Sequence, residues 1–169
     1  MRVLVTAASR HGATLEIAEA IGEELSSHGL EVTTVPVDEV PGVAAFDAAV
    51  IGSAVYYGHW LEPARELVDA HASELADRAV WLFSSGPLGE SGHELPADDA
   101  LDVSSQLAAA QPLEHRIFAG KLDRHQLGFR EKTMVAALKA PVGDFRDWTA
   151  IRAFAASIAE YLSRLPQPS

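Results

Sequence analysis

The strongest constraint on the fold is an alternation of short apolar runs with longer amphipathic segments. Runs rich in Val, Ile and Ala predict buried strands at residues 2–6, 31–37, 47–52, 78–83 and 114–119. Apolar side chains at helical spacing predict helices at residues 14–27, 62–71, 97–110 and 147–165. Strands that alternate with helices form right-handed crossovers, so we expect an α/β fold with a five-stranded parallel sheet covered by helices on both faces.

Two segments depart from this regular alternation. Pro36 lies within the run 31–37 and predicts that this strand is at an edge of the sheet. Residues 120–146 separate the last strand from the last helix by far more than an ordinary connection. We interpret this segment as an insert before the last helix, with a short helix of its own at residues 129–139.

The composition excludes several classes of protein. The 169 residues include no cysteine, which rules out disulfides, thiolate nucleophiles, Fe–S clusters and Cys-ligated zinc. The net charge of −11 argues against a general nucleic-acid binder. No apolar run has the roughly 20 residues of a membrane span, and the chain enters a strand without a signal sequence, so we expect a cytoplasmic protein. We expect one domain at residues 1–165 and a polar tail at 166–169.

The loops after the strands carry the candidate chemistry, because ligands of open α/β sheets bind at the carboxyl ends of strands. The first loop, Ser9-Arg10-His11-Gly12-Ala13-Thr14, leads directly into a helix. Hydroxyls, a glycine that allows close backbone approach and the N–H groups of a helix start predict a phosphate site, to which Arg10 adds charge. The alternative is that Ser9 and Thr14 only cap the helix.

This first loop also excludes two nucleotide-binding classes. It lacks the Gly-Lys-Ser/Thr ending of a P-loop and the three spaced glycines of a dinucleotide fingerprint. The pattern therefore argues against an NTPase and a Rossmann dehydrogenase.

The second loop, residues 52–60, is crowded with aromatic side chains. Tyr56, Tyr57 and Trp60 lie there with His59, and their rings suit stacking on a planar ligand. The alternative, which we favour for Trp60, is packing over the end of the sheet. The third loop, residues 84–89, is a Gly/Pro turn that exposes backbone groups able to bond the polar edge of a heterocycle. Taken alone, the third loop favours an ordinary turn.

The order of elements and these three loops together resemble the flavodoxin superfamily. Residues 9–14 are similar to its Ser/Thr-x-Thr-Gly-x-Thr phosphate loop, with His11 at a usual hydroxyl position and Ala13 where Asn is common. Within the superfamily, the chain resembles the menaquinone-dependent protoporphyrinogen oxidase group in residues 51–59, 118–122 and 143–148 and in the long segment before the last helix.

The resemblance implies a flavodoxin-like three-layer sandwich with strand order 2-1-3-4-5 and FMN as cofactor. It implies that the cofactor-binding residues are Ser9, Arg10, His11, Gly12, Ala13 and Thr14 for the phosphate, and Ser53, Ala54, Val55, Tyr56, Tyr57, Gly58, Ser85, Gly86, Pro87, Leu88 and Gly89 for the isoalloxazine ring. His59 is the best candidate for an acid–base residue. We expect no metal site, since none of the seven His residues forms a His-x-x-x-His or His-Glu-x-x-His pair.

The function implied is an FMN-dependent oxidoreductase that passes electrons from an organic donor, such as a tetrapyrrole, to a quinone-type acceptor. One alternative is a flavodoxin-type one-electron carrier, which the acidic composition favours. Another is a binding domain that kept the fold and lost FMN. A Ser-His-Asp hydrolase is disfavoured because the chain has no Gly-x-Ser-x-Gly elbow. Related short enzymes of this fold often dimerise, so a homodimer is compatible with the resemblance.

The insert contains the one basic segment of the chain. Residues 121–139 have five basic and two acidic side chains, hence +3, while the remainder has eight basic and 22 acidic ones, hence −14. Phe129, Met134, Val135 and Leu138 predict an apolar stripe on the short helix. This pattern favours contact with an anionic substrate, a redox partner or, peripherally, the inner face of a membrane. The alternative is a helix that packs on the domain and leaves its charges in water.

Overall fold

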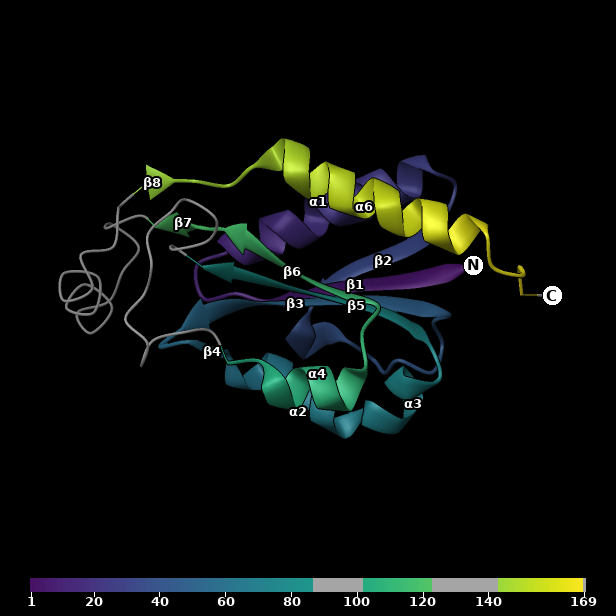
Figure 1. The fold of residues 1–169 in the computed structure, drawn as a ribbon, viewed down its shortest axis with the longest axis horizontal. Coiled ribbons are helices and arrows are strands. Elements are labelled where there is room, and N and C mark those ends of the chain that lie inside the picture. The colour runs from purple at the N-terminus through teal and green to yellow at the C-terminus, as the bar shows by residue number, and fades with distance from the viewer. Residues whose placement is uncertain (87–101, 123–142, 169) are drawn as a thin grey trace.

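A parallel sheet forms the middle layer of the computed structural model, which describes residues 1–86, 102–122 and 143–168 (Figure 1). Its strands are β1 (Arg2–Ala8), β2 (Glu31–Pro36), β3 (Ala48–Tyr56), β5 (Ala79–Gly86) and β6 (Glu114–Ala119), in the order β2-β1-β3-β5-β6. A short strand, β4 (His59–Trp60), pairs antiparallel with the end of β3. Without β4 the order is 2-1-3-4-5, and both the predicted order and the predicted edge position of β2 are confirmed.

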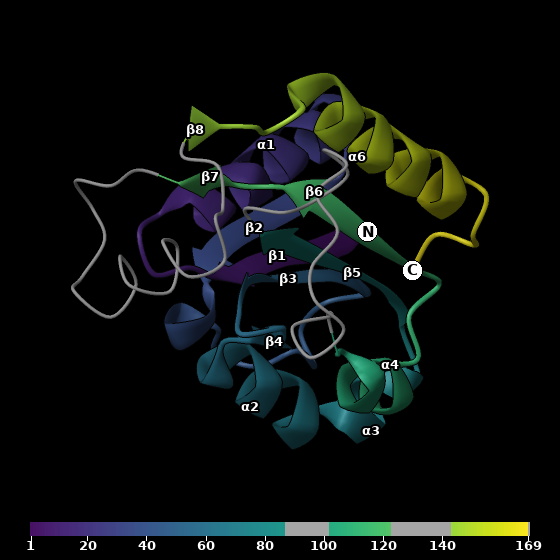
Figure 2. The ribbon, with the colours of Figure 1, turned by 60° about the vertical axis from the view of Figure 1, so that its left-hand side comes forward.

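Helices cover both faces of the sheet (Figures 1 and 2). The first face carries α1 (Ala13–Ser27) and α6 (Trp148–Ser163), and the second carries α2 (Glu62–Ala70), α3 (Ala72–Ala76) and α4 (Ser104–Ala110). A 3-10 turn, η1 (Val37–Glu39), follows β2. The three-layer arrangement is therefore confirmed. Within the described ranges, no helix is long and apolar enough to cross a membrane.

Each face of the sheet has its own apolar core. Under α1 and α6, the predicted helix stripe of Ile17, Ile21 and Leu25 is fully buried. Phe118 packs there against Phe154, with ring centroids 5.5 Å apart. The second core lies under α2, α3 and α4 and contains Leu4, Ile51, Trp60, Leu75 and Leu82. Because the central strands supply side chains to both cores, their sequences are almost continuously apolar.

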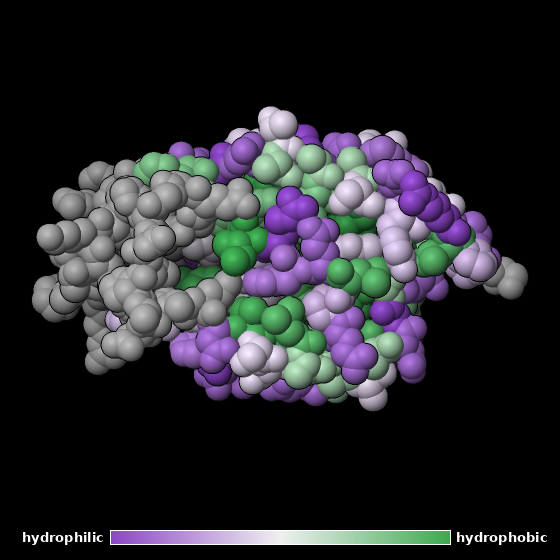
Figure 3. All heavy atoms as spheres, in the orientation of Figure 1, coloured by the Kyte–Doolittle hydropathy of each residue, from purple (hydrophilic) through white to green (hydrophobic). Residues whose placement is uncertain are grey.

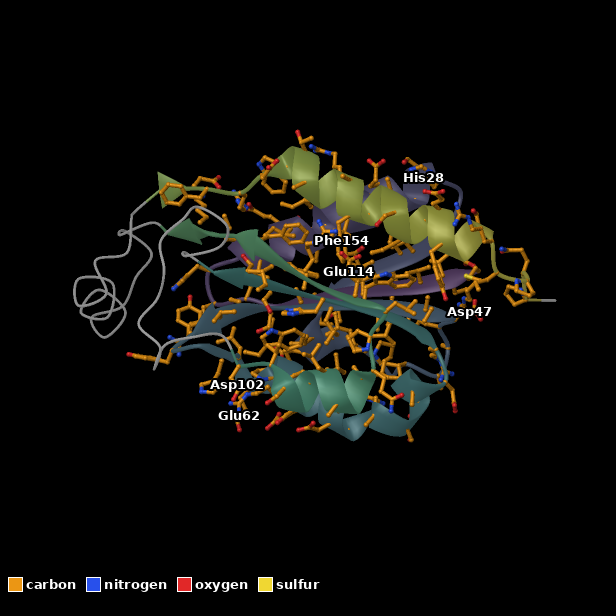
Figure 4. The ribbon with its side chains drawn as sticks, viewed as in Figure 1. His28, Asp47, Glu62, Asp102, Glu114 and Phe154 are labelled. Atoms are coloured by element: carbon orange, nitrogen blue, oxygen red, sulfur yellow. The ribbon has the colours of Figure 1, made fainter. Side chains whose placement is uncertain are left out.

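The register of the strands brings their carboxyl ends to one edge of the sheet. Ser53 on β3 pairs with Ala8 on β1 and with Ser84 on β5, and Gly86 pairs with Ala119 on β6. After β1 the chain crosses to β2, whereas after β3 it crosses to β5 on the other side, so a topological switch point lies between β1 and β3. At the opposite end, the Asp47 carboxylate accepts the Arg2 amide at 2.7 Å, and Figure 4 shows Asp47 far from Asp102.

β6 is the outermost strand of the sheet, opposite β2, within the part of the chain that the structure describes. Its Arg116 donates to the Glu114 carboxylate, with Nε 2.9 Å from Oε1, and lies over the Phe154 ring at 5.5 Å. Leu113 and Ile117 are exposed beside this pair. Figure 3, which views the molecule from this side, shows hydrophilic and hydrophobic residues interspersed. A charged pair on an edge strand opposes edge-to-edge association.

The structure differs from the sequence prediction in the lengths of several elements. β3 extends to Tyr56 and β5 to Gly86, so the serines assigned to loops lie within paired strands. The predicted helix 97–110 begins only at Ser104, because the Asp102 carboxylate accepts the Ser104 amide and hydroxyl at 3.1 and 2.7 Å and marks the helix start. Residues 97–101 and the predicted helix 129–139 lie outside the described residues.

Two further elements join the ends of the insert. β7 (Lys121–Leu122) and β8 (Gly143–Asp144) pair antiparallel, with Lys121 opposite Asp144. The Phe145 amide donates to the Gly120 carbonyl at 3.1 Å. The two ends of segment 123–142 are therefore held together beside the carboxyl end of β6 (Figure 1).

Candidate functional site

The loop after β1 is held by the side chain of Ser9. Its Oγ accepts the amide of Gly12 at 2.9 Å and the amide of Thr14 at 3.3 Å. The residue at the N-cap position of α1 is Gly12, and Ser9 binds the start of the helix from three residues before it. Thr14 does not precede the helix but lies in its first turn, and Thr14 is only 3% exposed. A hydroxyl oxygen that gathers two backbone amides marks the place where a ligand oxygen could bind the same donors.

Gly12 gives this loop its shape and its access to a ligand. It directly precedes α1 and has φ 87°, in the left-handed region that glycine adopts without strain. Among the residues that the structure describes, no atom lies within 4 Å of a Cβ built on Gly12, so none of them fills the space beside its backbone. This space, amide donors and the positive end of a helix dipole fit a phosphate group.

The second candidate segment forms a tight β-hairpin. Tyr56 on β3 pairs with His59 on β4, and Tyr57 and Gly58 make the turn with φ of 51° and 77°. Positive φ at both central residues is the geometry of a type I′ turn, in which Tyr is an unusual choice. Tyr57 is 61% exposed at the tip. The Gly58 carbonyl accepts the Asp102 amide at 2.7 Å, which fixes the hairpin to the residues before α4.

Arg10 brings the two segments together. Its guanidinium carbon lies 4.9 Å from the centroid of the Tyr56 ring, a cation–π contact. The loop 9–14 and the tyrosines of the hairpin are therefore neighbours at the switch point. This juxtaposition places amide donors for an anion beside an aromatic surface for a planar ring.

The serines assigned to the second and third loops are buried. Ser53 Oγ donates to the Ala54 carbonyl at 2.8 Å and accepts the Leu61 amide at 3.0 Å. Ser85 is 3% exposed, and Gly86 ends β5. Any contact of these residues with a ligand would therefore involve the backbone at the strand ends. Pro87, Leu88 and Gly89 lie outside the described residues.

A hydrogen-bonded chain of three side chains lies beneath the hairpin. Trp60 Nε1 donates to Ser84 Oγ at 2.8 Å, and Ser84 Oγ lies 2.7 Å from His115 Nε2. Trp60 is 2% exposed, so the packing interpretation of this residue is confirmed. Burial lowers the pKa of His115 below its ordinary value of 6.5, so the imidazole is held neutral.

His59 occupies an exposed position on β4. Hydrogen bonds from Ser104 lower the pKa of the Asp102 carboxyl, and the charge of His59 contributes to the same shift. His59 and Asp102 are thus close enough to interact electrostatically at the mouth of the site.

Arg146 is a site residue that the sequence reasoning missed. Its side chain is 5% exposed, and its guanidinium binds both Asp144 oxygens at 2.9 and 2.7 Å. Nη1 donates to the Ala13 carbonyl at 3.3 Å and to the Glu16 carboxylate. The hydrogen bond with Asp144 raises the pKa of Arg146 and holds the pKa of Asp144 below its usual range. The signal is present in residues 143–148, but no spacing rule links Arg146 to Ala13, 133 residues earlier.

Comparison with proteins of known sequence gives the family. The flavodoxin domain matches residues 4–148. Protoporphyrinogen IX dehydrogenase [quinone] of Escherichia coli K12 is 32% identical over 86 residues, which are 50% of this chain and 48% of that protein. The match thus spans about half the length of the curated relatives.

Solved structures show the same fold along nearly the whole chain. A flavodoxin from the domain Archaea has a TM-score of 0.64 at 19% identity and covers 97% of this chain and 100% of its own. Flavodoxin 1 from Bacillus cereus has a TM-score of 0.62 at 15% identity, with coverages of 98% and 100%. Rubredoxin oxygen:oxidoreductase from Desulfovibrio gigas has a TM-score of 0.62 at 14% identity over 96% of this chain and 36% of that one. With its match over residues 4–148, the chain belongs to the flavodoxin domain family, which implies a flavin cofactor.

Proposed function

We propose that this chain is an FMN-dependent oxidoreductase that passes electrons from an organic donor to a quinone-type acceptor. The observation that carries the proposal is the juxtaposition, at the switch point, of the Ser9–Thr14 loop with the tyrosines of the β3–β4 hairpin. The similarity to a quinone-dependent protoporphyrinogen IX dehydrogenase supports the choice of acceptor and of a tetrapyrrole donor.

The residues of the first loop would hold the phosphate of FMN. The amides of Gly12 and Thr14, which now donate to Ser9 Oγ, would donate to phosphate oxygens, and the helix dipole of α1 favours the negative charge. Arg10 adds a positive charge at the same edge. His11 and Ala13 contribute backbone, so the departures from the usual hydroxyl and Asn remove side-chain bonds but not the cradle.

The carboxyl ends of β3 and β5 would hold the isoalloxazine ring. We assign it to the carboxyl ends of β3 and β5, at residues 53–58 and 85–86, where the buried serines leave the backbone as the polar surface. Tyr56 and Tyr57 would orient the ring by contact with its face. When bound, FMN supplies the transfer of two electrons between donor and acceptor. His59, exposed beside Asp102, is our candidate for proton transfer to the quinone, which takes up two electrons and two protons to become a quinol.

The basic segment 121–139 is our candidate contact for an anionic donor or a membrane surface that carries quinone. Its net charge of +3 contrasts with −14 on the rest of the chain. Its first residues, Lys121 and Leu122, pair with Asp144 and Gly143, which lie two and three residues before the Arg146 that contacts the first loop. A dimer formed near the exposed Tyr57 would also be compatible with the site.

A second candidate function is a one-electron carrier without an organic substrate. The observation in its favour is the acidic surface of α1, where Glu16, Glu19 and Glu23 are exposed. An acidic surface steers a protein toward basic partners.

Anaerobic mixing separates the two functions. Protein loaded with FMN is mixed with protoporphyrinogen and a water-soluble menaquinone analogue, and porphyrin fluorescence is followed. The oxidoreductase predicts fluorescence that grows over many turnovers and requires both FMN and quinone. A carrier predicts no turnover above the rate of free FMN, although it exchanges electrons with a reductase, and that result would overturn the proposal.

A further inference from the structure

Arg146 is a buried charge held at the base of the insert by carboxylates. Its Nε and Nη2 form a forked pair with Asp144, and its guanidinium lies 4.6 Å from the Trp148 ring centroid at the start of α6. A buried guanidinium is costly unless its donors are satisfied, so this geometry is well defined. Such an arrangement points to a role that a surface arginine could not perform.

The remaining nitrogen of Arg146 reaches the loop proposed to hold phosphate. Nη1 donates to the Ala13 carbonyl at 3.3 Å and to the Glu16 carboxylate on the first turn of α1. The Ala13 carbonyl belongs to the same peptide unit as the Thr14 amide, and this planar unit moves as one body. That amide is one of the two that converge on Ser9 Oγ.

We propose that Arg146 is a positioning residue for the phosphate site, which orients the Ala13–Thr14 peptide from behind so that the Thr14 amide faces the ligand. This inference rests on the proposed binding of FMN. A cation on the carbonyl side also polarises the peptide and strengthens its amide as a donor. The affinity for the phosphate group then depends on a residue at the far end of the insert.

The charges around Arg146 sharpen the proposal. Asp144 and Glu16 both pair with the guanidinium, so loss of Arg146 would leave two carboxylates near a dianionic ligand. Repulsion alone could therefore weaken FMN binding. A substitution of Glu16 distinguishes this effect from orientation of the peptide.

The test compares FMN with riboflavin, which lacks only the phosphate. Dissociation constants for both are measured with apoprotein by quenching of flavin fluorescence. Arg146→Met is expected to lower the preference for FMN over riboflavin about tenfold, as befits a lost hydrogen bond to a charged group. Arg146→Lys keeps the charge but not the forked pair with Asp144, so its preference for FMN is expected to lie between those of the wild type and Arg146→Met. Arg164→Met is the matched control, because Arg164 pairs with Glu160 near the other end of α6 and is 73% exposed, and it should keep the wild-type preference.

Three results with the variants would overturn the inference. The first is an unchanged preference for FMN in Arg146→Met, or in Arg146→Lys if the Met variant does not fold. The second is an equal loss of affinity for both ligands, which indicates general damage. The third is full recovery of the preference in the double variant Glu16→Gln/Arg146→Met, which indicates that repulsion alone was responsible. Wild-type protein that binds neither flavin would remove the proposed function and this inference with it. If the wild type prefers FMN and Arg146→Met has the same preference, only the inference is removed and the proposed function stands.

Discussion

At the scale of the residue, Gly12 carries the clearest expectation for ligand binding. Its φ of 87° disfavours any side chain, and no residue of the described ranges fills the space beside it. We expect Gly12→Ala to lower the free energy of unfolding by about 1–2 kcal/mol through backbone strain and also to weaken FMN binding at least tenfold, because the methyl group enters the phosphate space.

Gly29 provides a matched control for Gly12. It has φ 85° and follows the other end of α1, and no atom of the described residues lies within 4 Å of a Cβ built on it. Gly29→Ala should cost a similar free energy of unfolding in thermal melts but leave the FMN dissociation constant unchanged. Equal effects of the two substitutions on FMN would contradict the assignment of the phosphate site.

Tyr57 is a residue whose conformation is unfavourable for stability. It is exposed at φ 51°, where Asn or Gly is preferred in a type I′ turn. We expect Tyr57→Asn to raise the free energy of unfolding of the apoprotein by about 0.5–1 kcal/mol while it weakens flavin binding by loss of the ring. Gln111, at φ 48° after α4, is the control: Gln111→Asn should raise stability similarly without a change in binding. A Tyr57→Asn variant that binds FMN normally would remove this tyrosine from the site.

At the scale of the element, Gly120 determines how β6 and β7 join. A Cβ there would lie 2.9 Å from the Gly86 carbonyl oxygen. The same oxygen accepts a hydrogen bond from the Gly120 amide at 2.6 Å. Because both partners are backbone, Gly120→Ala should lower the free energy of unfolding by about 1–3 kcal/mol in urea titrations. In Gly86→Ala, the nearest described atom to the added Cβ is Val55 Cβ at 3.6 Å, so this control should cost clearly less. Equal losses would show that the close approach is relieved elsewhere.

The Trp60–Ser84–His115 chain ties β4, β5 and β6 together and predicts a pH dependence. Because burial lowers the pKa of His115, this side chain binds a proton near pH 6.5 in the unfolded chain but stays unprotonated there in the folded protein. The free energy of unfolding should therefore fall as the pH drops through 6.5 toward the folded pKa. His115→Gln should make this part of the pH profile flatter than in the wild type, as measured by urea titrations at several pH values. An identical slope in both proteins would show that His115 is not the group responsible.

At the scale of the whole molecule, the sequence predicts the architecture well and the site only in part. Apolar runs and the Ile17, Ile21 and Leu25 stripe are local signals, and the layers follow from them. The end of β3 was missed because Ser53 is polar and short, and only its pairing with β1 and β5 shows that it is in a strand. Arg146 was missed for a similar reason, since its partner Ala13 is close only in the folded chain.

The central claim is that the amides at the start of α1 bind the phosphate of a flavin, and NMR tests it most directly. FMN is added to uniformly ¹⁵N-labelled apoprotein, and the backbone amide signals of Gly12 and Thr14 are followed, with riboflavin in a parallel titration. We predict that both signals move with FMN, reach their limit at one equivalent, and move much less with riboflavin. If FMN binds while these two signals stay in place, or if FMN does not bind, the account is contradicted.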